Sequence, residues 1–373
     1  MFEKDTLSII GEGNSIYEDA ISPPIFQTST FGGGNDYSYS RLKNPTRDAL
    51  ERAMAKLESG EHAFAFSSGL AAINAIFSLL SGGDRVIISD DLYGGTYRLA
   101  VNLFSKYGIA FDFVDMTQPE NILPYITKKT KLIFAESPTN PMMKVIPIAD
   151  IAKICKENSL LFALDNTFLS PCFQNPLLLG ADIVIHSATK YLSGHHDTLA
   201  GIIVTDSDEI AKQIFMISMT LGNPLSPFDS WMVLRGLRTL PMRMEKHQKN
   251  ALAAAEYLKT RKEVRSVIYP GLPEHAGHEI MKKQAIGYGG VVSFTVDSKE
   301  TAQKLLNSGS IIRFAESLGG FRSLITYPLT QTHASIPEEI RKKIGITDTL
   351  LRLSVGLENE KDIINDLEMM FET

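Results

Sequence analysis

The segment Asp182-Ile-Val-Ile-His-Ser-Ala-Thr-Lys190 points to the fold class of this chain, because a short apolar run leads directly into hydroxyl side chains and a lysine. Comparable short runs lie on both sides of it, at residues 63–66, 86–89, 111–115, 132–136, 160–165 and 201–205. Each run is apolar on both faces, as in central strands that helices cover on both sides. Longer amphipathic runs separate them, at 71–80, 97–107 and 148–157. This alternation predicts an α/β fold, with a doubly wound large domain and a mostly parallel seven-stranded sheet.

The pattern changes after about residue 205. Residues 230–259 have long helical character, which is interrupted at Pro241. Strand-like runs separated by helices follow, at 264–269, 290–296, 311–314, 323–327 and 350–355. Residues 1–60 have few periodic elements, and their prolines and glycines suggest an extended arm. We therefore expect an arm over 1–60, a large domain over 61–245 and a smaller C-terminal α+β domain over 246–373.

Composition excludes several classes of partner. The chain has 37 Lys and Arg against 43 Asp and Glu among 373 residues, so it has no positive excess for nucleic-acid phosphates or an anionic membrane. The N-terminus lacks the apolar core of a signal peptide, and the most apolar stretch, 71–80, is too short to span a bilayer. Two cysteines, Cys155 and Cys172, are too few for a disulfide framework. We expect a cytoplasmic protein that binds neither nucleic acid nor a membrane.

Motifs for several other chemistries are missing or incomplete. The sequence has no G-x-x-x-x-G-K-[ST], so a P-loop is not supported. The turn Phe66-Ser-Ser-Gly69 lacks the first glycine of a nucleophile elbow, which disfavours a serine hydrolase. His195 and His196 are adjacent and have no third ligand at a telling spacing, so we predict no metal site.

Three polar features follow predicted strands, and the carboxyl ends of parallel strands meet at one edge of a sheet. The segment Ser67-Ser-Gly-Leu-Ala-Ala72 begins a helix, whose first backbone N–H groups favour a phosphate. Asp165 ends one apolar run, and Lys190 follows another, where a desolvated lysine can act as a nucleophile or base. Taken singly, these features are also compatible with a capped helix, a structural salt bridge and a surface lysine. Together they are the parts of a pyridoxal-phosphate site: an amine for the Schiff base, an acid for the pyridine nitrogen and a phosphate cradle.

Ordered motifs run through almost the whole chain: Tyr37-Ser-Tyr-Ser-Arg41, Asn44-Pro-Thr-Arg47, Ser67-Ser-Gly-Leu-Ala-Ala72, Asp91-Leu-Tyr-Gly-Gly95, Glu136-Ser-Pro-Thr-Asn-Pro141, Asp165-Asn-Thr-Phe168, His186-Ser-Ala-Thr-Lys-Tyr191, Ala315-Glu-Ser-Leu-Gly-Gly320 and Leu351-Arg-Leu-Ser-Val-Gly356. In these motifs the chain resembles the Cys/Met metabolism family of pyridoxal-phosphate enzymes, in the fold-type I class. The resemblance implies pyridoxal 5'-phosphate as cofactor. It also implies a homo-oligomer, a tetramer built as a dimer of dimers, in which the N-terminal arm contacts a neighbouring subunit and active sites are shared.

The resemblance also implies which residues hold the cofactor. Lys190 would form the Schiff base and move protons, Asp165 would pair with the pyridinium, and Tyr93 would stack on the ring and assist catalysis. The phosphate would be bound by the backbone of Gly69 and Leu70, by the hydroxyls of Ser187 and Thr189, and by Tyr39 and Arg41 of a neighbouring subunit.

Arg352 is the candidate for substrate binding. Strand alternation places Arg352 and Ser354 on the face opposite Leu351 and Leu353. A lone arginine in a buried strand needs an anionic partner, and the resemblance makes that partner the substrate α-carboxylate. Asn140 is expected near that carboxylate or near the cofactor phenolic oxygen.

A second part of the substrate site is expected around Glu316. Glu316 matches a position that is acidic in cystathionine γ-synthases and γ-lyases, where it would hold the distal ammonium of the substrate. Ser317, the next residue, is expected to line the same site. Arg322 and His196 depart from the family pattern, which usually has an acid and a small serine at these positions.

The resemblance leaves γ-replacement, γ-elimination and β-elimination as alternatives. We expect a cystathionine γ-synthase, which converts an O-acylhomoserine and L-cysteine into cystathionine and a carboxylic acid, with O-acetylhomoserine sulfhydrylase as an additional activity. The alternative is a cystathionine γ-lyase or β-lyase that releases a 2-oxo acid, ammonia and a thiol. A non-catalytic regulatory protein would need a DNA-binding extension, and none is evident in the sequence.

Overall fold

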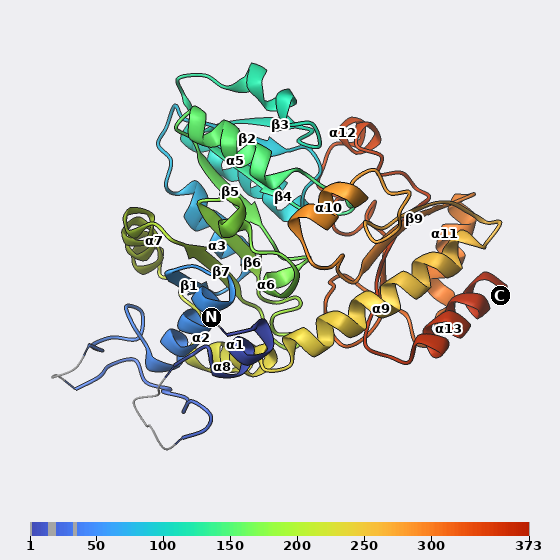
Figure 1. Cartoon of the computed structure of the whole chain (residues 1–373). Coiled ribbons are helices and arrows are strands. Elements are labelled where there is room, and N and C mark those ends of the chain that lie inside the picture. Colours follow the sequence, from blue (N-terminus) through green and yellow to red (C-terminus); the bar gives the residue numbers. More distant parts are fainter. Residues whose placement is uncertain (1, 14–19, 33–35, 373) are drawn as a thin grey trace.

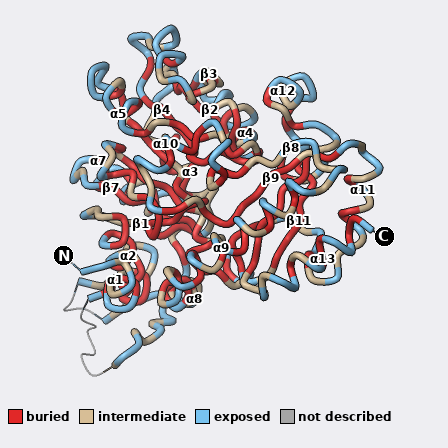
Figure 2. Tube along the Cα trace, turned by 45° about the vertical axis from the view of Figure 1, so that its right-hand side comes forward, coloured by how far each residue is buried: buried red, intermediate tan, exposed pale blue. Residues whose placement is uncertain are grey.

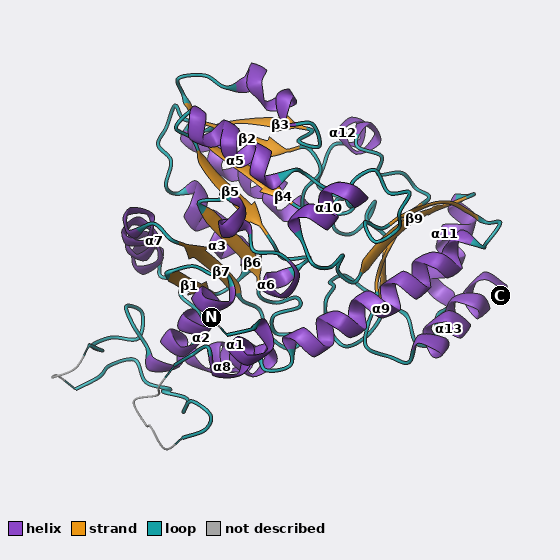
Figure 3. Ribbon diagram, viewed as in Figure 1, coloured by secondary structure: helices purple, strands orange, loops and turns teal. Residues whose placement is uncertain are grey.

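Two β-sheets divide the chain into a large lobe and a small one, on the left and right of Figures 1 and 3. The computed structural model describes residues 2–13, 20–32 and 36–372. Residues 1, 14–19 and 33–35 of the predicted arm therefore lie outside the described residues, as does residue 373. The central strands of both sheets are buried, as Figure 2 shows.

The large sheet has seven strands in the order β1-β7-β6-β5-β4-β2-β3. They are β1 (His62–Phe66), β2 (Arg85–Ser89), β3 (Ala110–Val114), β4 (Thr130–Glu136), β5 (Leu161–Asp165), β6 (Ile183–Ser187) and β7 (Gly201–Thr205). Strand β7 is antiparallel to β1 and β6, and the other neighbouring strands are parallel. The predicted doubly wound, mostly parallel sheet is confirmed.

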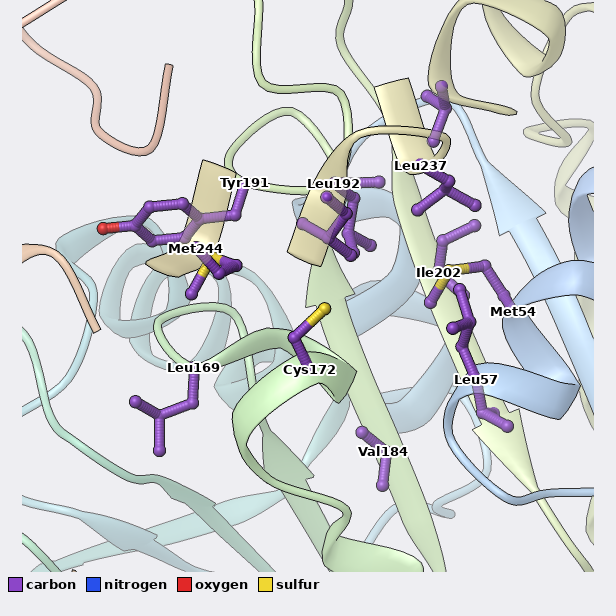
Figure 4. Close-up of a cluster of buried hydrophobic side chains, with 14 of the residues drawn as sticks. Met54, Leu57, Leu169, Cys172, Val184, Tyr191, Leu192, Ile202, Leu237 and Met244 are labelled. Carbon is purple, nitrogen blue, oxygen red and sulfur yellow. The ribbon is translucent and has the colours of Figure 1, made fainter. Parts of the chain in front are cut away.

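Helices cover both faces of this sheet. Val184 of β6 packs in a core cluster with residues of several helices on one face, and Ile183 and Ile185 pack with residues of other helices on the opposite face. Figure 4 shows the first cluster, to which Val184, Leu57, Ile202 and Leu237 belong. The helices of the large lobe are α2 (Pro45–Leu57), α3 (Gly69–Phe77), α4 (Gly94–Arg98), α5 (Ile148–Glu157), α6 (Ser170–Phe173), α7 (Asp208–Leu221) and α8 (Pro227–Leu237). With both faces covered, a ligand can enter only at the strand ends.

Shorter helical segments complete the large lobe. They are η3 (Pro119–Tyr125) and η4 (Pro176–Leu179), both 3-10 helices. The single helix expected over 97–107 is divided into the end of α4, a π-helical turn η1 (Leu99–Leu103) and a 3-10 helix η2 (Phe104–Tyr107).

The small lobe contains a five-stranded sheet in the order β10-β11-β12-β9-β8. Its strands are β8 (Val264–Ile268), β9 (Val291–Val296), β10 (Arg313–Phe314), β11 (Leu324–Thr326) and β12 (Leu350–Ser354), and its helices are α10 (His278–Gln284), α11 (Lys299–Ser308), α12 (Glu338–Lys343) and α13 (Glu360–Glu372). The long helix α9 (Leu240–Lys259) joins the lobes, since Met244 packs in a large-lobe cluster and Leu258 in the small-lobe cluster. The expected boundary between the large and the small domain, at residue 245, thus falls inside this helix.

The N-terminal region contains more regular structure than expected. Helix α1 (Lys4–Ile10) and helix α2 both contribute to the large-lobe core, so the expectation of an extended arm over all of residues 1–60 was wrong for these segments. Pro45, interpreted as a loop signal, is the first residue of α2, where a missing N–H costs no helical hydrogen bond. Asn44 caps that helix by accepting a hydrogen bond from the Thr46 N–H.

Within the described ranges, no helix is both long enough and apolar enough to span a membrane.

Candidate active site

A cavity of about 390 Å³ lies where strands β4, β5 and β6 end and β12 of the small lobe approaches them. Glu136, Asp165 and Ser187 are the last residues of those three strands. The cavity brings together most of the predicted site residues: Gly69, Leu70, Tyr93, Asn140, Asp165, Ser187, Thr189, Lys190, Glu316, Ser317 and Arg352. The structure therefore gathers residues up to 283 positions apart in the chain into one site.

Tyr39 and Arg41 are the two predicted site residues that do not line this cavity. The Arg41 guanidinium lies 5.5 Å from the centre of the Tyr39 ring and donates a hydrogen bond to the Met219 carbonyl oxygen at 2.8 Å. Both side chains are exposed. Their contribution to a neighbouring subunit's site stays a prediction.

The start of α3 forms an anion cradle. Ser68 has an extended backbone and caps the helix, because its hydroxyl accepts a hydrogen bond from the Ala71 N–H at 3.1 Å. At Gly69 an added Cβ would lie only 2.9 Å from the Cβ of Ser187. A glycine at this position therefore lets the start of α3 pack directly against Ser187. The first N–H groups of α3 have no partner within the helix, which makes this end favourable for a phosphate.

Hydroxyl groups flank the cradle. The hydroxyl of Thr189 bonds to the backbone of Ala200, accepting from its N–H at 3.0 Å and donating to its carbonyl at 3.2 Å. Thr167, which the sequence argument did not single out, accepts a hydrogen bond from the Ser187 N–H at 2.8 Å. Its position two residues after Asp165 was a usable signal, because a threonine there can bond back to the carboxylate.

Asp165 is the acid of the site. Its Oδ1 accepts hydrogen bonds from the N–H and the hydroxyl of Thr167, which hold the carboxylate in place. Burial raises the pKa of Asp165, and the Thr167 hydrogen bonds oppose that increase. A half-buried carboxylate in this position would be stabilised by a cation beside it, such as a protonated pyridine nitrogen.

Lys190 is the amine of the site. Its Nζ donates a hydrogen bond to the Ser317 hydroxyl at 3.0 Å. Burial lowers the pKa of Lys190 to about 8, the nearby Arg352 guanidinium acts in the same direction, and Glu316 opposes both. A large part of this amine is therefore uncharged in mildly alkaline solution, which is the nucleophilic form.

Arg352 lines the cavity from the centre of β12, where it is 1% exposed. It donates to the Asn140 side-chain oxygen at 2.7 Å and to the Ser317 carbonyl and Thr326 hydroxyl at 3.0 and 3.2 Å. Its Nε has no partner among the described residues. Burial lowers the pKa of Arg352 to about 10, and a buried guanidinium surrounded mainly by neutral groups is a site for a carboxylate.

The two departures from the family pattern, His196 and Arg322, make contacts of their own outside the cavity lining. His196 is exposed, and its ring packs against that of Phe321 with centroids 5.6 Å apart. The Arg322 Nε donates to the Ile311 carbonyl at 3.3 Å. Neither residue is among the described residues that line the cavity.

In the described part of the chain, no group of three or more His, Cys, Asp and Glu side chains could hold a metal ion.

The residues present fit pyridoxal phosphate. The cradle at Gly69 suits its phosphate, Lys190 supplies an amine of lowered pKa for its aldehyde, and Asp165 supplies a carboxyl group for its ring nitrogen. Tyr93, which is partly exposed in the cavity wall, offers an aromatic face for the ring.

Comparisons with known proteins agree with this interpretation. The family model described as "Cys/Met metabolism PLP-dependent enzyme" matches residues 5–372. Cystathionine β-lyase of Lactococcus lactis subsp. cremoris is 48% identical over 358 residues, which cover 95% of this chain and 94% of the relative. The cystathionine γ-synthase/O-acetylhomoserine (thiol)-lyase of Bacillus subtilis is 44% identical over 367 residues, covering 97% and 94%.

A solved structure extends the likeness to three dimensions. The cystathionine γ-lyase of Lactobacillus plantarum, complexed with L-serine, superposes with a TM-score of 0.98 at 42% identity, covering 100% of this chain and 99% of the other. The fold is therefore that of the fold-type I class, and the cofactor is pyridoxal 5'-phosphate. The chain belongs to the Cys/Met metabolism family of PLP-dependent enzymes.

Proposed function

We propose that the protein is a cystathionine γ-synthase, which joins an O-acylhomoserine to L-cysteine and releases a carboxylic acid. The observation that carries this proposal is that Glu316 lines the same cavity as Lys190 and Arg352. Arg352 provides a positive group for the α-carboxylate, and Glu316 provides a negative group for a second ammonium. A substrate or product with an amino-acid group at each end, such as cystathionine, matches this distribution of charge.

The chain's own residues have distinct tasks in this reaction. Arg352 and Asn140 bind the α-carboxylate and thereby orient the Cα–H bond. Lys190 holds and moves protons: its amine, with a pKa of about 8, accepts the proton from Cα and serves the second transfer at Cβ. Pyridoxal phosphate supplies the electron sink that makes the proton at Cα acidic. Asp165 supports that sink from its place at the end of β5.

A cystathionine lyase is the second candidate. The Lactococcus relative, which is named a β-lyase, is more similar to this chain than the Bacillus relative, which is named a γ-synthase. The same two-ended cavity would hold cystathionine as a substrate for cleavage. The two candidates differ in the step after proton removal: a thiol adds in the synthase, whereas the lyase releases a 2-oxo acid, ammonia and a thiol.

Product analysis separates the candidates. The purified protein is incubated with O-acetylhomoserine or O-succinylhomoserine plus L-cysteine and, in parallel, with L-cystathionine alone. We expect cystathionine to form in the first set faster than 2-oxo acid is released in the second. Faster 2-oxo acid release from cystathionine would replace the synthase proposal with the lyase.

A variant tests the role of Glu316. Glu316→Gln is expected to raise KM for L-cysteine roughly tenfold, as loss of a charge-assisted hydrogen bond would, and to leave KM for the O-acylhomoserine unchanged. Glu338→Gln, an exposed position on α12, is the matched control. An equal increase in both KM values would argue against a distal ammonium site.

We also propose that the protein works as a cytoplasmic homo-oligomer, a tetramer in which Tyr39 and Arg41 complete a neighbouring subunit's phosphate site. Support comes from the exposure of both side chains and from their position outside the cavity of their own subunit.

A further inference from the structure

His333 is a buried histidine that the mechanism above does not use. It lies in the segment between β11 and α12 of the small lobe and is 0% exposed. Its Nε2 lies 3.1 Å from the carbonyl oxygen of Leu92 and 3.0 Å from that of Asn140. Its Nδ1 lies 2.7 Å from the hydroxyl of Thr332.

These contacts determine the protonation of the ring. Carbonyl oxygens only accept hydrogen bonds, so Nε2 must carry a proton and donate to both of them. Burial lowers the pKa of His333 to about 4, and the Arg352 guanidinium acts in the same direction. The ring is therefore neutral near physiological pH, and Nδ1 accepts a hydrogen bond from Thr332. His333 is thus a fixed donor rather than a titrating base.

The first carbonyl belongs to the peptide group that precedes Tyr93. The N–H of the same peptide group donates to Glu136 Oε1 at 3.0 Å. The peptide group is consequently held at its oxygen by His333 and at its nitrogen by Glu136. Beside it, an added Cβ at Gly94 would lie 2.1 Å from the Thr332 carbonyl oxygen, so the Tyr93 loop packs directly on the His333 segment.

The second carbonyl belongs to Asn140, whose side-chain oxygen accepts from Arg352. The carbonyl of the following residue, Pro141, accepts a hydrogen bond from the Ser293 hydroxyl at 2.6 Å. One imidazole N–H therefore connects the loop that carries the aromatic face of the cavity to the loop that carries half of the carboxylate site.

We infer that His333 is a positioning residue that sets the placement of Tyr93 relative to the Asn140–Arg352 pair. This inference rests on the proposed use of Asn140 and Arg352 for a substrate carboxylate, and it holds for a synthase or a lyase alike. The closing experiment therefore uses the holoenzyme with L-alanine, which has the α-carboxylate and amine of the substrates but no leaving group.

The test compares His333→Asn with His333→Gln. A glutamine places an amide N–H₂ where Nε2 lies, so it can donate to both carbonyls, whereas an asparagine is too short. We expect His333→Asn to weaken L-alanine binding about tenfold, measured by titration of the cofactor absorbance, since small misplacements of binding groups are costly. We expect His333→Gln to stay within about threefold of wild type. The cofactor absorbance in the absence of L-alanine should be the same in both variants.

Other outcomes overturn the inference. Unchanged L-alanine affinity in His333→Asn would do so, and equal loss in both variants would show that packing, not the Nε2 donor, matters. If His333→Asn does not fold, Thr332→Val becomes the deciding variant, because it removes the hydroxyl that holds the ring at Nδ1. Its L-alanine affinity should fall about threefold, and an unchanged affinity would overturn the inference. Failure of the γ-synthase assay, by contrast, would leave this binding test intact.

Discussion

Glu136 and Asp165 lie directly opposite each other on the parallel strands β4 and β5, and both line the active-site cavity. Burial raises the pKa of Glu136 well above its usual range, and the neighbouring Asp165 charge raises it further. Two adjacent buried carboxyl groups do not both ionise readily. The two carboxyl groups therefore oppose each other's ionisation, and a cationic ring beside Asp165 would favour the charged form there.

This relationship makes a prediction for Glu136→Gln. Glutamine is neutral, as Glu136 is when protonated, and its oxygen can still accept from the Tyr93 N–H. We expect kcat/KM at pH 7 to stay within about threefold of wild type. Because glutamine cannot ionise, any alkaline loss of activity that comes from Glu136 should disappear from the pH profile.

Glu136→Ala is the contrasting variant. It also removes the ionisable group, but it leaves the Tyr93 N–H without its acceptor, which costs about 1–3 kcal/mol of stability. We expect a lower melting temperature and a lower kcat/KM than in Glu136→Gln. Equal behaviour of the two variants would contradict a role for Glu136 in holding the Tyr93 peptide.

Arg352→Lys tests the carboxylate site. The lysine ammonium cannot reproduce the planar fork that bonds Asn140, Ser317 and Thr326 together. We expect KM for the amino-acid substrate to rise about 10- to 100-fold, as loss of charge-assisted hydrogen bonds predicts. The cofactor absorbance should remain, since Lys190 is unchanged. Arg322→Lys, outside the cavity lining, is the matched control, and an equal KM in both variants would refute the assignment.

Arg41→Ala tests the proposed subunit contact. If Arg41 binds the phosphate in a neighbouring subunit, loss of its guanidinium should weaken cofactor retention about tenfold or more. Retention is measured as the cofactor absorbance that remains after dialysis at a series of protein concentrations. Lys43→Ala, an exposed cation two residues away, is the control. Unchanged retention in Arg41→Ala would count against cross-subunit binding of the phosphate.

The cofactor half of the site could be predicted from local sequence because each part lies at the end of its own strand or the start of a helix. The run ending at Asp165 and the run leading to Lys190 show which side chains are buried and where the chain turns. Parallel pairing then brings them together without further information. The same logic placed the phosphate cradle at the start of the helix that is α3 in the structure.

Other features depended on contacts between distant segments. His333 has no local signal, because its importance comes from two carbonyl oxygens 241 and 193 residues away in sequence. Helix α2 was missed because Pro45 is as compatible with a first helical turn as with a loop, and packing on the large-lobe core decides between them. The synthase and lyase alternatives also remain, since both use the same Lys190 and Arg352.

The buried His247 of α9 should make the stability of the protein sensitive to acid. The ring is 0% exposed, and its Nδ1 donates to the Val355 carbonyl at 2.7 Å, while Nε2 has no partner in the described part of the chain. Burial lowers the pKa of His247 to about 4. Between pH 6.5 and 4 the unfolded chain therefore binds a proton that the folded protein does not, so acidification favours unfolding.

The predicted change can be measured by urea unfolding across that pH range. His247 should contribute a loss of about 1.4 kcal/mol of unfolding free energy per pH unit between about pH 6 and pH 4. In His247→Asn, whose amide N–H can still donate to Val355, the loss should be shallower by that amount. Buried acids of raised pKa, such as Asp91, increase the free energy of unfolding as the pH falls. They are present in both proteins, so they do not affect the comparison. Parallel curves for the two proteins would mean that His247 titrates equally in the folded and unfolded states.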